Sequence, residues 1–260
     1  MPANARVPTG TRVLVEVAVD SVTGAEAAVA GGADRLELCA NLREGGLTPS
    51  LGLFEAVRAA VPVPVFVMLR PRPGDFLYDR GEFAAMQRDA AHFRSAGANG
   101  LVAGILTADG ALDAPRLRDL FAVGEGLPST CHRAFDLCRD PDRALSTLLD
   151  LGTARVLTSG QAPSAPLGSE CIRRLVLAAG DRLTVLAGAG VRDDNVAALV
   201  AATGVREVHL SATSWRPSAM TFRRDGVPMG SAVPTDEYTL RTTDPALVAR
   251  VRQALASMRG

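Results

Sequence analysis

Short apolar runs, each ending in a polar residue with useful chemistry, recur along this chain at regular intervals. The eight runs are VLVEVAVD, RLELCAN, VFVMLRPR, LVAGILT, STCHRAFD, RVLTSGQ, LTVLAGAG and EVHLSAT. The segments between them have helical length and carry apolar residues three and four positions apart, which is the β-α alternation of a parallel sheet. Eight such units in 260 residues predict an α/β fold, a single TIM-type (β/α)₈ barrel whose active face lies at the strand ends.

The predicted barrel domain covers residues 13–260, after a disordered lead over residues 1–12. Its strands are expected over 13–19, 35–39, 63–70, 101–106, 130–135, 156–158, 183–187 and 208–211. Residues 213–243 are too long for an ordinary loop and are expected to be an insertion between the eighth strand and the last helix. Within it, Met220 and Phe222 alternate with polar residues up to Asp225 and Gly226, which predicts a small hairpin. The insertion could serve as a lid, a plug or an oligomer contact.

Charge and composition exclude several classes of function. The chain has 28 basic and 28 acidic residues, so it lacks the basic surface of a nucleic-acid-binding protein. No stretch approaches the roughly 20 apolar residues that cross a bilayer, and the first dozen residues contain no apolar signal region. We expect a cytoplasmic protein with reduced cysteines, whose partner is a small-molecule or anionic ligand rather than nucleic acid or membrane. Every basic residue is arginine, which excludes an imine on a lysine side chain.

The alternation of residues along each strand predicts which side chains face the barrel interior. In the first strand Val15, Val17 and Val19 form the face toward the helices, so Glu16 points inward. The same reasoning places one or more polar side chains of the second, third, fifth and eighth strands inside. The candidate catalytic residues are therefore Glu16, Glu37, Arg70, His132 and His209.

Two carboxylates, an arginine and two histidines in one interior allow more than one interpretation. A buried charge is costly unless it is paired, so Glu16 or Glu37 paired with Arg70 could be a structural network. A carboxylate beside an imidazole is also an acid-base pair, with His132 titrating near neutral pH and a carboxylate kept ionised by Arg70. The same groups could hold a divalent metal.

Glycines and polar residues follow the last three predicted strands. Ser159 and Gln161 follow the sixth strand, Gly188 and Gly190 the seventh, and Ser211 the eighth. Barrels often bind phosphate with backbone N–H groups of these loops, which glycine lets approach the anion closely. The pattern predicts an anion-binding site, and the alternative is a tight turn that needs glycine for its φ angle.

Several longer motifs resemble the CutC family of copper homeostasis proteins. They are ADRLELCANLREGGLTPS, RPRPGDFLY, CHRAFDLCRDP, ARVLTSGQ, LAGAGV and TDEYTL, and the resemblance runs from about Val13 to Leu255. It implies a TIM-type barrel, a cytoplasmic location, a homodimer or higher homo-oligomer, and binding of copper(I). The residues that stand in family-like motifs are Glu16, Glu37, Arg70, His132, Arg133, Asp136, Ser159, Gln161, Gly188, Gly190 and His209.

The chain departs from the family pattern at one position, and this departure predicts that any copper(I) binding is weak. Copper(I) prefers soft thiolate and thioether ligands. Relatives often carry one cysteine on the first strand and one on the second, whereas this chain keeps Cys39 and has Ala18 at the first position. Met68 is the candidate thioether. Two functions stay open: copper homeostasis, or a barrel enzyme of isomerase or lyase type that acts by acid-base chemistry on a small anionic hydroxylated metabolite. A scaffold without chemistry is the third interpretation.

Overall fold

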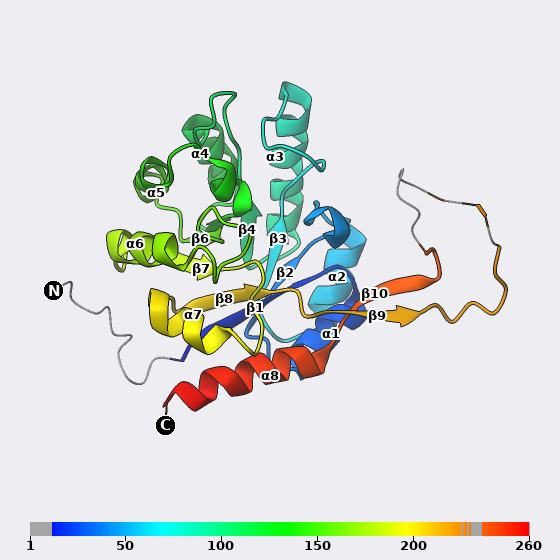
Figure 1. Cartoon of the computed structure of the whole chain (residues 1–260). Helices are drawn as coiled ribbons and strands as arrows, with labels where there is room; N and C mark the ends of the chain where they lie inside the picture. Colours follow the sequence, from blue (N-terminus) through cyan, green and yellow to red (C-terminus); the bar gives the residue numbers. More distant parts are fainter. Residues whose placement is uncertain (1–11, 225, 228, 230–235, 260) are drawn as a thin grey trace.

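The computed structural model describes residues 12–224, 226–227, 229 and 236–259, and its centre is a closed barrel of eight parallel strands (Figure 1). The strands are β1 (Leu14–Val19), β2 (Arg35–Leu38), β3 (Val65–Met68), β4 (Gly100–Ala103), β5 (Ser129–Cys131), β6 (Arg155–Thr158), β7 (Thr184–Ala187) and β8 (Glu207–Leu210). Each strand pairs with the next in the chain, and β8 pairs with β1 to close the ring. The predicted (β/α)₈ barrel is confirmed.

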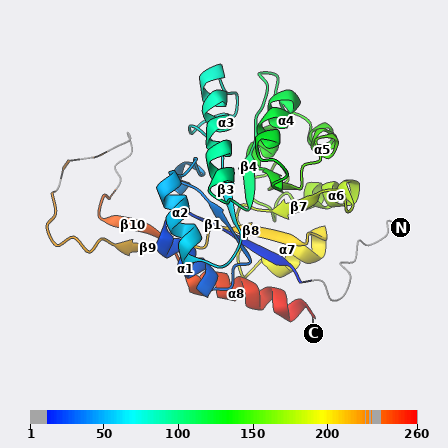
Figure 2. The same ribbon diagram turned by 180° about the vertical axis from the view of Figure 1, so that it is seen from behind.

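Helices follow the strands and cover the outside of the barrel (Figures 1 and 2). They are α1 (Val22–Ala30), α2 (Leu51–Ala60), α3 (Arg80–Ser95), α4 (Ala114–Val123), α5 (Pro141–Asp150), α6 (Ser169–Ala179), α7 (Val196–Thr203) and α8 (Pro245–Ala256). Local chemistry fixes where several begin. Asp79 and Glu82 form a capping box at α3, and Asp140 caps α5 directly before its first-turn proline. No helix of the described residues is long and apolar enough to cross a membrane.

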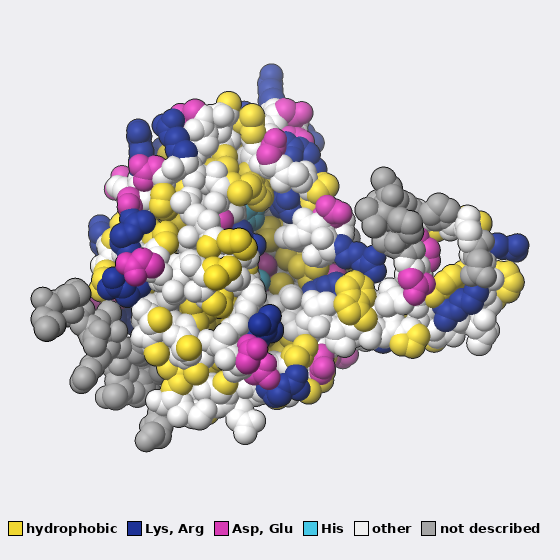
Figure 3. Space-filling view, viewed as in Figure 1, with side chains coloured by type: hydrophobic (Ala, Val, Ile, Leu, Met, Phe, Trp, Pro, Cys, Tyr) yellow, Lys and Arg dark blue, Asp and Glu magenta, His cyan; other side chains and the backbone are white. Residues whose placement is uncertain are grey.

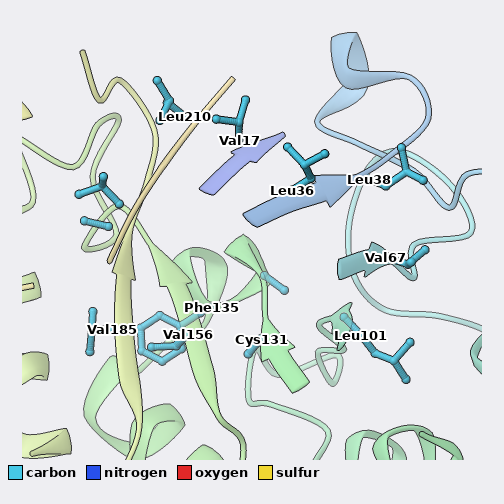
Figure 4. Packing of buried hydrophobic residues seen from close by; sticks show 14 of the residues in the cluster. Val17, Leu36, Leu38, Val67, Leu101, Cys131, Phe135, Val156, Val185 and Leu210 are labelled. Atoms are coloured by element: carbon cyan, nitrogen blue, oxygen red, sulfur yellow. The ribbon is translucent and has the colours of Figure 1, made fainter. Parts of the chain in front are cut away.

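The main apolar core lies between the barrel and its helices. Val17, Leu36 and Val67 belong to this layer, which Figure 4 shows around the strands. A second, smaller cluster of Cys39, Phe66, Met68 and Val102 fills part of the barrel interior. Full burial of one such apolar side chain stabilises the fold by about 1.5–3 kcal/mol, so the outer layer fixes which face of each strand turns inward. The predicted assignment of strand faces is confirmed.

The strand ends differ from the predicted ones. The fifth strand, predicted over 130–135, ends at Cys131, and Arg133–Leu137 is a 3₁₀ turn, η2. The prediction was wrong because the His132 side chain accepts the backbone N–H of Ala134 and turns the chain out of the extended conformation. The third and fourth strands, predicted over 63–70 and 101–106, are also shorter and span only 65–68 and 100–103.

Between β8 and α8 the chain leaves the barrel as an antiparallel two-stranded ribbon, β9 (Thr213–Pro217) with β10 (Thr239–Thr243) (Figures 1 and 2). A hairpin was predicted here, but in the wrong place, because Met220 and Phe222 lie beyond the end of β9. The predicted turn residue Asp225 is outside the described residues, as is the predicted disordered lead up to residue 11.

The ribbon is attached to the barrel by Arg241. Its NH2 group donates to Thr213 Oγ1 at 2.6 Å, and its NH1 group lies 3.5 Å from the Asp20 carboxylate that follows β1. The first rung of the ribbon is Thr213 opposite Thr243. The ribbon and the chain between its two strands expose several large apolar side chains to solvent, among them Trp215, Met220, Phe222 and Leu240.

Candidate functional site

A cavity of about 650 Å³ opens where the barrel strands end. In the view of Figure 3 the molecule is hollowed at its centre, and histidine and acidic side chains are visible within the hollow. The predicted site residues that line this cavity are Glu37, Arg70, His132, Gly190, His209 and Ser211. The structure therefore brings together side chains that come from β2, β3, β5, β7 and β8 or directly follow them.

His209 lies between two glutamates in the barrel interior. Strand pairing sets Glu16 opposite His209 and Ala18 opposite Glu37. His209 Nδ1 is 2.8 Å from Glu16 Oε1, and His209 Nε2 is 3.8 Å from Glu37 Oε2. The two glutamates are buried and the histidine nearly so, so water screens the interactions between their charges only weakly.

The surroundings drive the pKa values of these groups apart. Burial alone would raise the pKa of Glu16, but Arg35 and His209 outweigh burial and lower this pKa from 4.5 to about 2. Burial raises the pKa of Glu37 from 4.5 to about 7, against the opposing charge of His209. Burial by itself lowers the pKa of His209, yet the adjoining Glu37 and Glu16 raise it overall. Glu16 is thus ionised at neutral pH, whereas Glu37 can gain or lose a proton there.

A buried ion network lies below Glu16, nearer the start of the strands. Arg35 Nε donates to Glu16 Oε2, and its NH2 group donates to Glu207 Oε2. Arg155 Nε donates to the same Glu207 oxygen at 3.2 Å. The guanidinium carbons of Arg35 and Arg155 lie 4.9 and 5.1 Å from the ring centre of Phe66. Because each carboxylate has a cationic partner, the network satisfies the requirement that buried charges be paired.

Sequence reasoning missed this network, although strand alternation carried the signal. Arg35 precedes Glu37 by two positions, and Glu207 precedes His209 by two. Residues two apart on a strand share a face, so both belong to the inward face already assigned to their neighbours. The predicted strand began at Val208, which left Glu207 out.

Arg70 directs its guanidinium at loop carbonyls. NH1 donates to the backbone oxygens of Glu44 at 2.7 Å and Gly46 at 3.2 Å, and NH2 donates to that of Gly74 at 2.9 Å. The predicted pairing of Arg70 with an interior glutamate was wrong. Arg70 lies beyond the end of β3, level with the loops that follow β2 and β3, and their carbonyl groups are within its reach.

His132 is buried and neutral. Its Nδ1 accepts the backbone N–H of Ala134 at 3.1 Å, which leaves the ring proton on Nε2. Burial, helped by the nearby charge of Arg70, lowers the pKa of His132 from 6.5 to about 3. The expectation that this histidine titrates near neutral pH was therefore wrong. Gly104 makes room for the ring, because a Cβ at that position would lie 2.6 Å from it.

The polar groups after β6 bind Asp136. The backbone N–H groups of Ser159 and Gln161 donate to this carboxylate at 3.0 and 3.2 Å, and Arg133 Nε donates to it at 2.7 Å. The side-chain amide of Gln161 donates to the backbone oxygen of Cys138. These donors of Ser159 and Gln161 are occupied within the protein, which leaves the loops after β7 and β8 to carry the predicted anion site.

The loop after β7 reaches the cavity at Gly190. This residue has φ of +70°, a conformation that glycine adopts without strain. Gly188 is required for packing, since a Cβ there would lie 2.5 Å from Leu157. Ser211 lines the cavity with its hydroxyl 3.0 Å from that of Thr213. Anion binding at Gly188, Gly190 and Ser211 stays a prediction.

One set of interior residues has the geometry to hold a divalent metal. Glu16, Glu37 and His209 each offer a ligand atom, and these atoms lie within 4.8 Å of one another. Carboxylate oxygen and imidazole nitrogen suit several divalent ions. Arg35 occupies one oxygen of Glu16, so a metal would have to share that carboxylate with a buried cation.

Cys39 is the candidate soft ligand. It is fully buried beside Met68 in the small interior cluster, and its Sγ donates to Glu37 Oε2 at 3.7 Å. Burial raises the pKa of the Cys39 thiol well above its usual value, and the charge of Glu37 adds to this. The side chain is therefore a neutral thiol at physiological pH, not the thiolate that binds metals best.

Comparison with known proteins places the chain among named relatives. The model of the CutC family matches residues 13–214. A human protein named copper homeostasis protein cutC homolog is 47% identical over 253 residues, which cover 95% of this chain and 92% of the human protein. A family protein CutC of Vibrio vulnificus (strain YJ016) is 47% identical over 246 residues, covering 94% of this chain and 98% of that protein.

Solved structures agree with this placement. The crystal structure of the putative copper homeostasis protein CutC from Streptococcus agalactiae is 30% identical, with a TM-score of 0.73 over 76% of this chain and 97% of that one. Thiamine phosphate pyrophosphorylase from Pyrococcus furiosus has a TM-score of 0.58 at 14% identity, over 96% of this chain and 98% of that one, and so shares the fold alone. From the matched family model and the extent of these identities, the chain belongs to the CutC family.

Proposed function

We propose that this protein acts in copper homeostasis and binds copper(I) weakly through Cys39. The names of its relatives support the first part, because human and mouse proteins 47% and 46% identical to it are both named copper homeostasis protein cutC homologs. The second part is supported by the packing of Cys39 and Met68 in the same small interior cluster. A thiol and a thioether are the ligand types that copper(I) prefers.

The weakness of the proposed copper site follows from its ligands. Copper(I) must displace the thiol proton of Cys39, whose pKa is raised by burial and by Glu37. Ala18, opposite Glu37 on β1, contributes no second thiolate. Competition for copper(I) against a chelator of known affinity tests the proposal. Weak retention that disappears in Cys39→Ser supports it, and tight retention that survives this substitution contradicts it.

A second candidate function, acid-base catalysis, is favoured by Glu37. Its Oε1 has no hydrogen-bond partner among the described residues, and the side chain borders the 650 Å³ cavity. A carboxyl group whose pKa is raised to about 7 is suited to proton transfer at neutral pH. We infer an isomerase or lyase type of reaction on a small anionic hydroxylated metabolite, without a lysine imine, since the chain has no lysine.

The acid-base proposal is tested by finding the compound and then removing the carboxylate. Mass spectrometry of the purified protein identifies any small molecule that is retained in the cavity. With that compound as substrate, Glu37→Gln should lower turnover by about 10²–10⁴-fold, the usual contribution of one proton-transfer group. Full activity of the variant would exclude Glu37 as that group.

The proposal also includes a cytoplasmic location and a homodimer or larger homo-oligomer. All four cysteines are free, which fits a reducing compartment. Trp215, Met220 and Phe222 are 52%, 57% and 62% exposed, and exposed apolar groups of this size often mark a contact with another chain. Light scattering of the unchanged chain and of a Trp215→Ser, Phe222→Ser variant tests the oligomer, since a protein that is monomeric before substitution contradicts it.

A further inference from the structure

Arg70 is a buried cation without an acidic partner. Arg70 is only 6% exposed, and no described carboxylate forms an ion pair with it. The neighbouring phenol of Tyr78 stays neutral, because burial raises its pKa to about 12 against the opposing effect of Arg70. A buried charge that lacks a counter-charge is strongly unfavourable, so the site is electrostatically complementary to an anion.

Arg70 and His132 each also have one buried N–H group without an acceptor among the described residues. Arg70 Nε, His132 Nε2 and the hydroxyl of Tyr78 have no hydrogen-bond partner among the described residues, and all three atoms are shielded from solvent. The Nε2 atom carries the ring proton, because Nδ1 accepts the N–H of Ala134. A buried donor left without an acceptor costs about 1–3 kcal/mol, so two of them in residues that line one cavity call for an acceptor supplied by a ligand.

The ring of Phe76 connects the two donors. The guanidinium carbon of Arg70 lies 5.0 Å from the ring centre of Phe76, and the ring centres of Phe76 and His132 are also 5.0 Å apart. All three residues line the same cavity as Glu37. We propose that Arg70 and His132 form an oxyanion subsite that binds the carboxylate or enolate oxygen of a small ligand.

The chemistry of the cavity limits what that ligand can be. Its negatively charged oxygen accepts hydrogen bonds from Arg70 and His132, and a hydroxyl group elsewhere on it can donate to the free Oε1 of Glu37. A small 2-hydroxycarboxylate satisfies both requirements. Because the two nitrogens are shielded, the oxygen reaches them only if neighbouring side chains move, and the Phe76 ring contacts both residues.

This subsite, in residues that follow β3 and β5, is distinct from the predicted anion site at Gly190 and Ser211, which follow β7 and β8. The inference names a substrate class for the acid-base function proposed above, and in that sense rests on it. In this subsite His132 is a fixed, neutral hydrogen-bond donor and does not transfer a proton. Binding alone tests it, so its failure is separable from a failure of copper binding or of catalysis.

The experiment is a chemical-shift titration of ¹⁵N-labelled protein with glycolate, with neutral glycolamide as the matched probe. The chain has only three histidines, so the ring signals of His132 can be assigned by substitution. We expect its Nε2–H signal to shift saturably with glycolate and not with glycolamide. His132→Asn keeps an oxygen that can cap Ala134, but its shorter side chain cannot place an N–H group where Nε2 lies, so it should weaken glycolate binding by about tenfold or more.

Two further variants make the result decisive. Arg70→Gln should abolish binding, but it also removes three bonds to loop carbonyls, so His132→Asn remains the cleaner test. Arg192→Gln changes an exposed cation beside Gly190 and should leave the affinity unchanged. Equal affinity in His132→Asn, loss of binding in Arg192→Gln alone, or no binding by the unchanged chain would each overturn the proposal.

Discussion

The Nδ1 atom of His209 lies 2.8 Å from Oε1 of Glu16, in the interior of the barrel and beside a second glutamate, Glu37. The two carboxylates are held in different charge states by different neighbours. Arg35 keeps Glu16 ionised, while the described residues give Glu37 only an imidazole and a thiol as hydrogen-bond or ion-pair partners. Of these two carboxylates, Glu16 thus stays charged, while Glu37 can change its charge near neutral pH.

Replacement of Glu37 by glutamine should change the dependence of stability on pH. The pKa of Glu37 is raised from 4.5 in the unfolded chain to about 7, so the folded state binds more protons between these values. Its contribution to stability is therefore complete below about pH 4.5 and is lost as the pH rises through 7. Glu37→Gln removes that loss. Relative to the unchanged chain, the variant should gain on the order of 3 kcal/mol between pH 4.5 and 8.

Urea denaturation of both proteins across this range measures the difference. Substitution of His92, which lies on α3, is the matched control, because it changes a titratable group outside the barrel interior. Parallel curves for Glu37→Gln and the unchanged chain would show that Glu37 has an ordinary pKa.

Removal of Arg35 should destabilise the protein strongly. Arg35→Met leaves Glu16 without its cation and Glu207 with only Arg155, and an uncompensated buried charge costs about 3–5 kcal/mol. Arg206→Met breaks an exposed pair with Asp181, a change worth about 0–1 kcal/mol. Urea unfolding of the two variants measures both losses of stability, and the midpoint should fall much further for Arg35→Met. Equal midpoints would mean that the buried network contributes no more than a surface pair.

How far the sequence predicts this molecule depends on which interaction places a residue. Strand alternation correctly predicts that Glu16, Glu37 and His209 face inward, because burial of the valines and leucines on the opposite face leaves no other register. The partners of Arg70 could not be predicted, since they are loop carbonyls whose position depends on the folded loops and not on their side chains.

The low pKa of His132 could not be predicted from the sequence, for a related reason. Its inward position follows from alternation, but its low pKa follows from burial and from the charge of Arg70, which come from the assembled fold. The same holds for Ser159 and Gln161, whose donors are taken by Asp136, a residue that is more than twenty positions away in the chain. Residue type alone could not reveal that these donors are already used.

Copper(I) retention should depend on Cys39 and improve with a second thiolate. Cys39→Ser should abolish the weak retention, whereas Cys171→Ser, at a half-buried cysteine outside the barrel interior, should leave it unchanged. Ala18→Cys places a thiol on β1 directly opposite Glu37 and should tighten binding. Competition with a copper(I) chelator measures all three. Strong binding by the unchanged chain, or none gained by Ala18→Cys, contradicts this account of the ligands.

A methyl group at Gly104 should disturb the histidine site. In Gly104→Ala the new Cβ would lie 2.6 Å from the His132 ring and 2.7 Å from the Ala134 side chain, and such crowding costs about 1–3 kcal/mol. Gly52→Ala is the matched control, because nothing lies within 4 Å of that Cβ on α2, and alanine there should stabilise the helix by up to about 1 kcal/mol. Thermal unfolding distinguishes the two, and equal shifts would contradict the close contact.

The pairing of Thr213 with Thr243 has a consequence for how the chain can vary in length. The chain leaves the barrel after β8 at Thr213 and returns to it at Thr243, and these two residues are paired. The start of α8 therefore does not depend on the length of chain between β9 and β10. Closing a longer loop on a paired stem costs little additional entropy. Insertions and deletions between Pro217 and Thr239 should therefore be absorbed outside the barrel, and this is the stretch at which the chain can accept a tag or a graft.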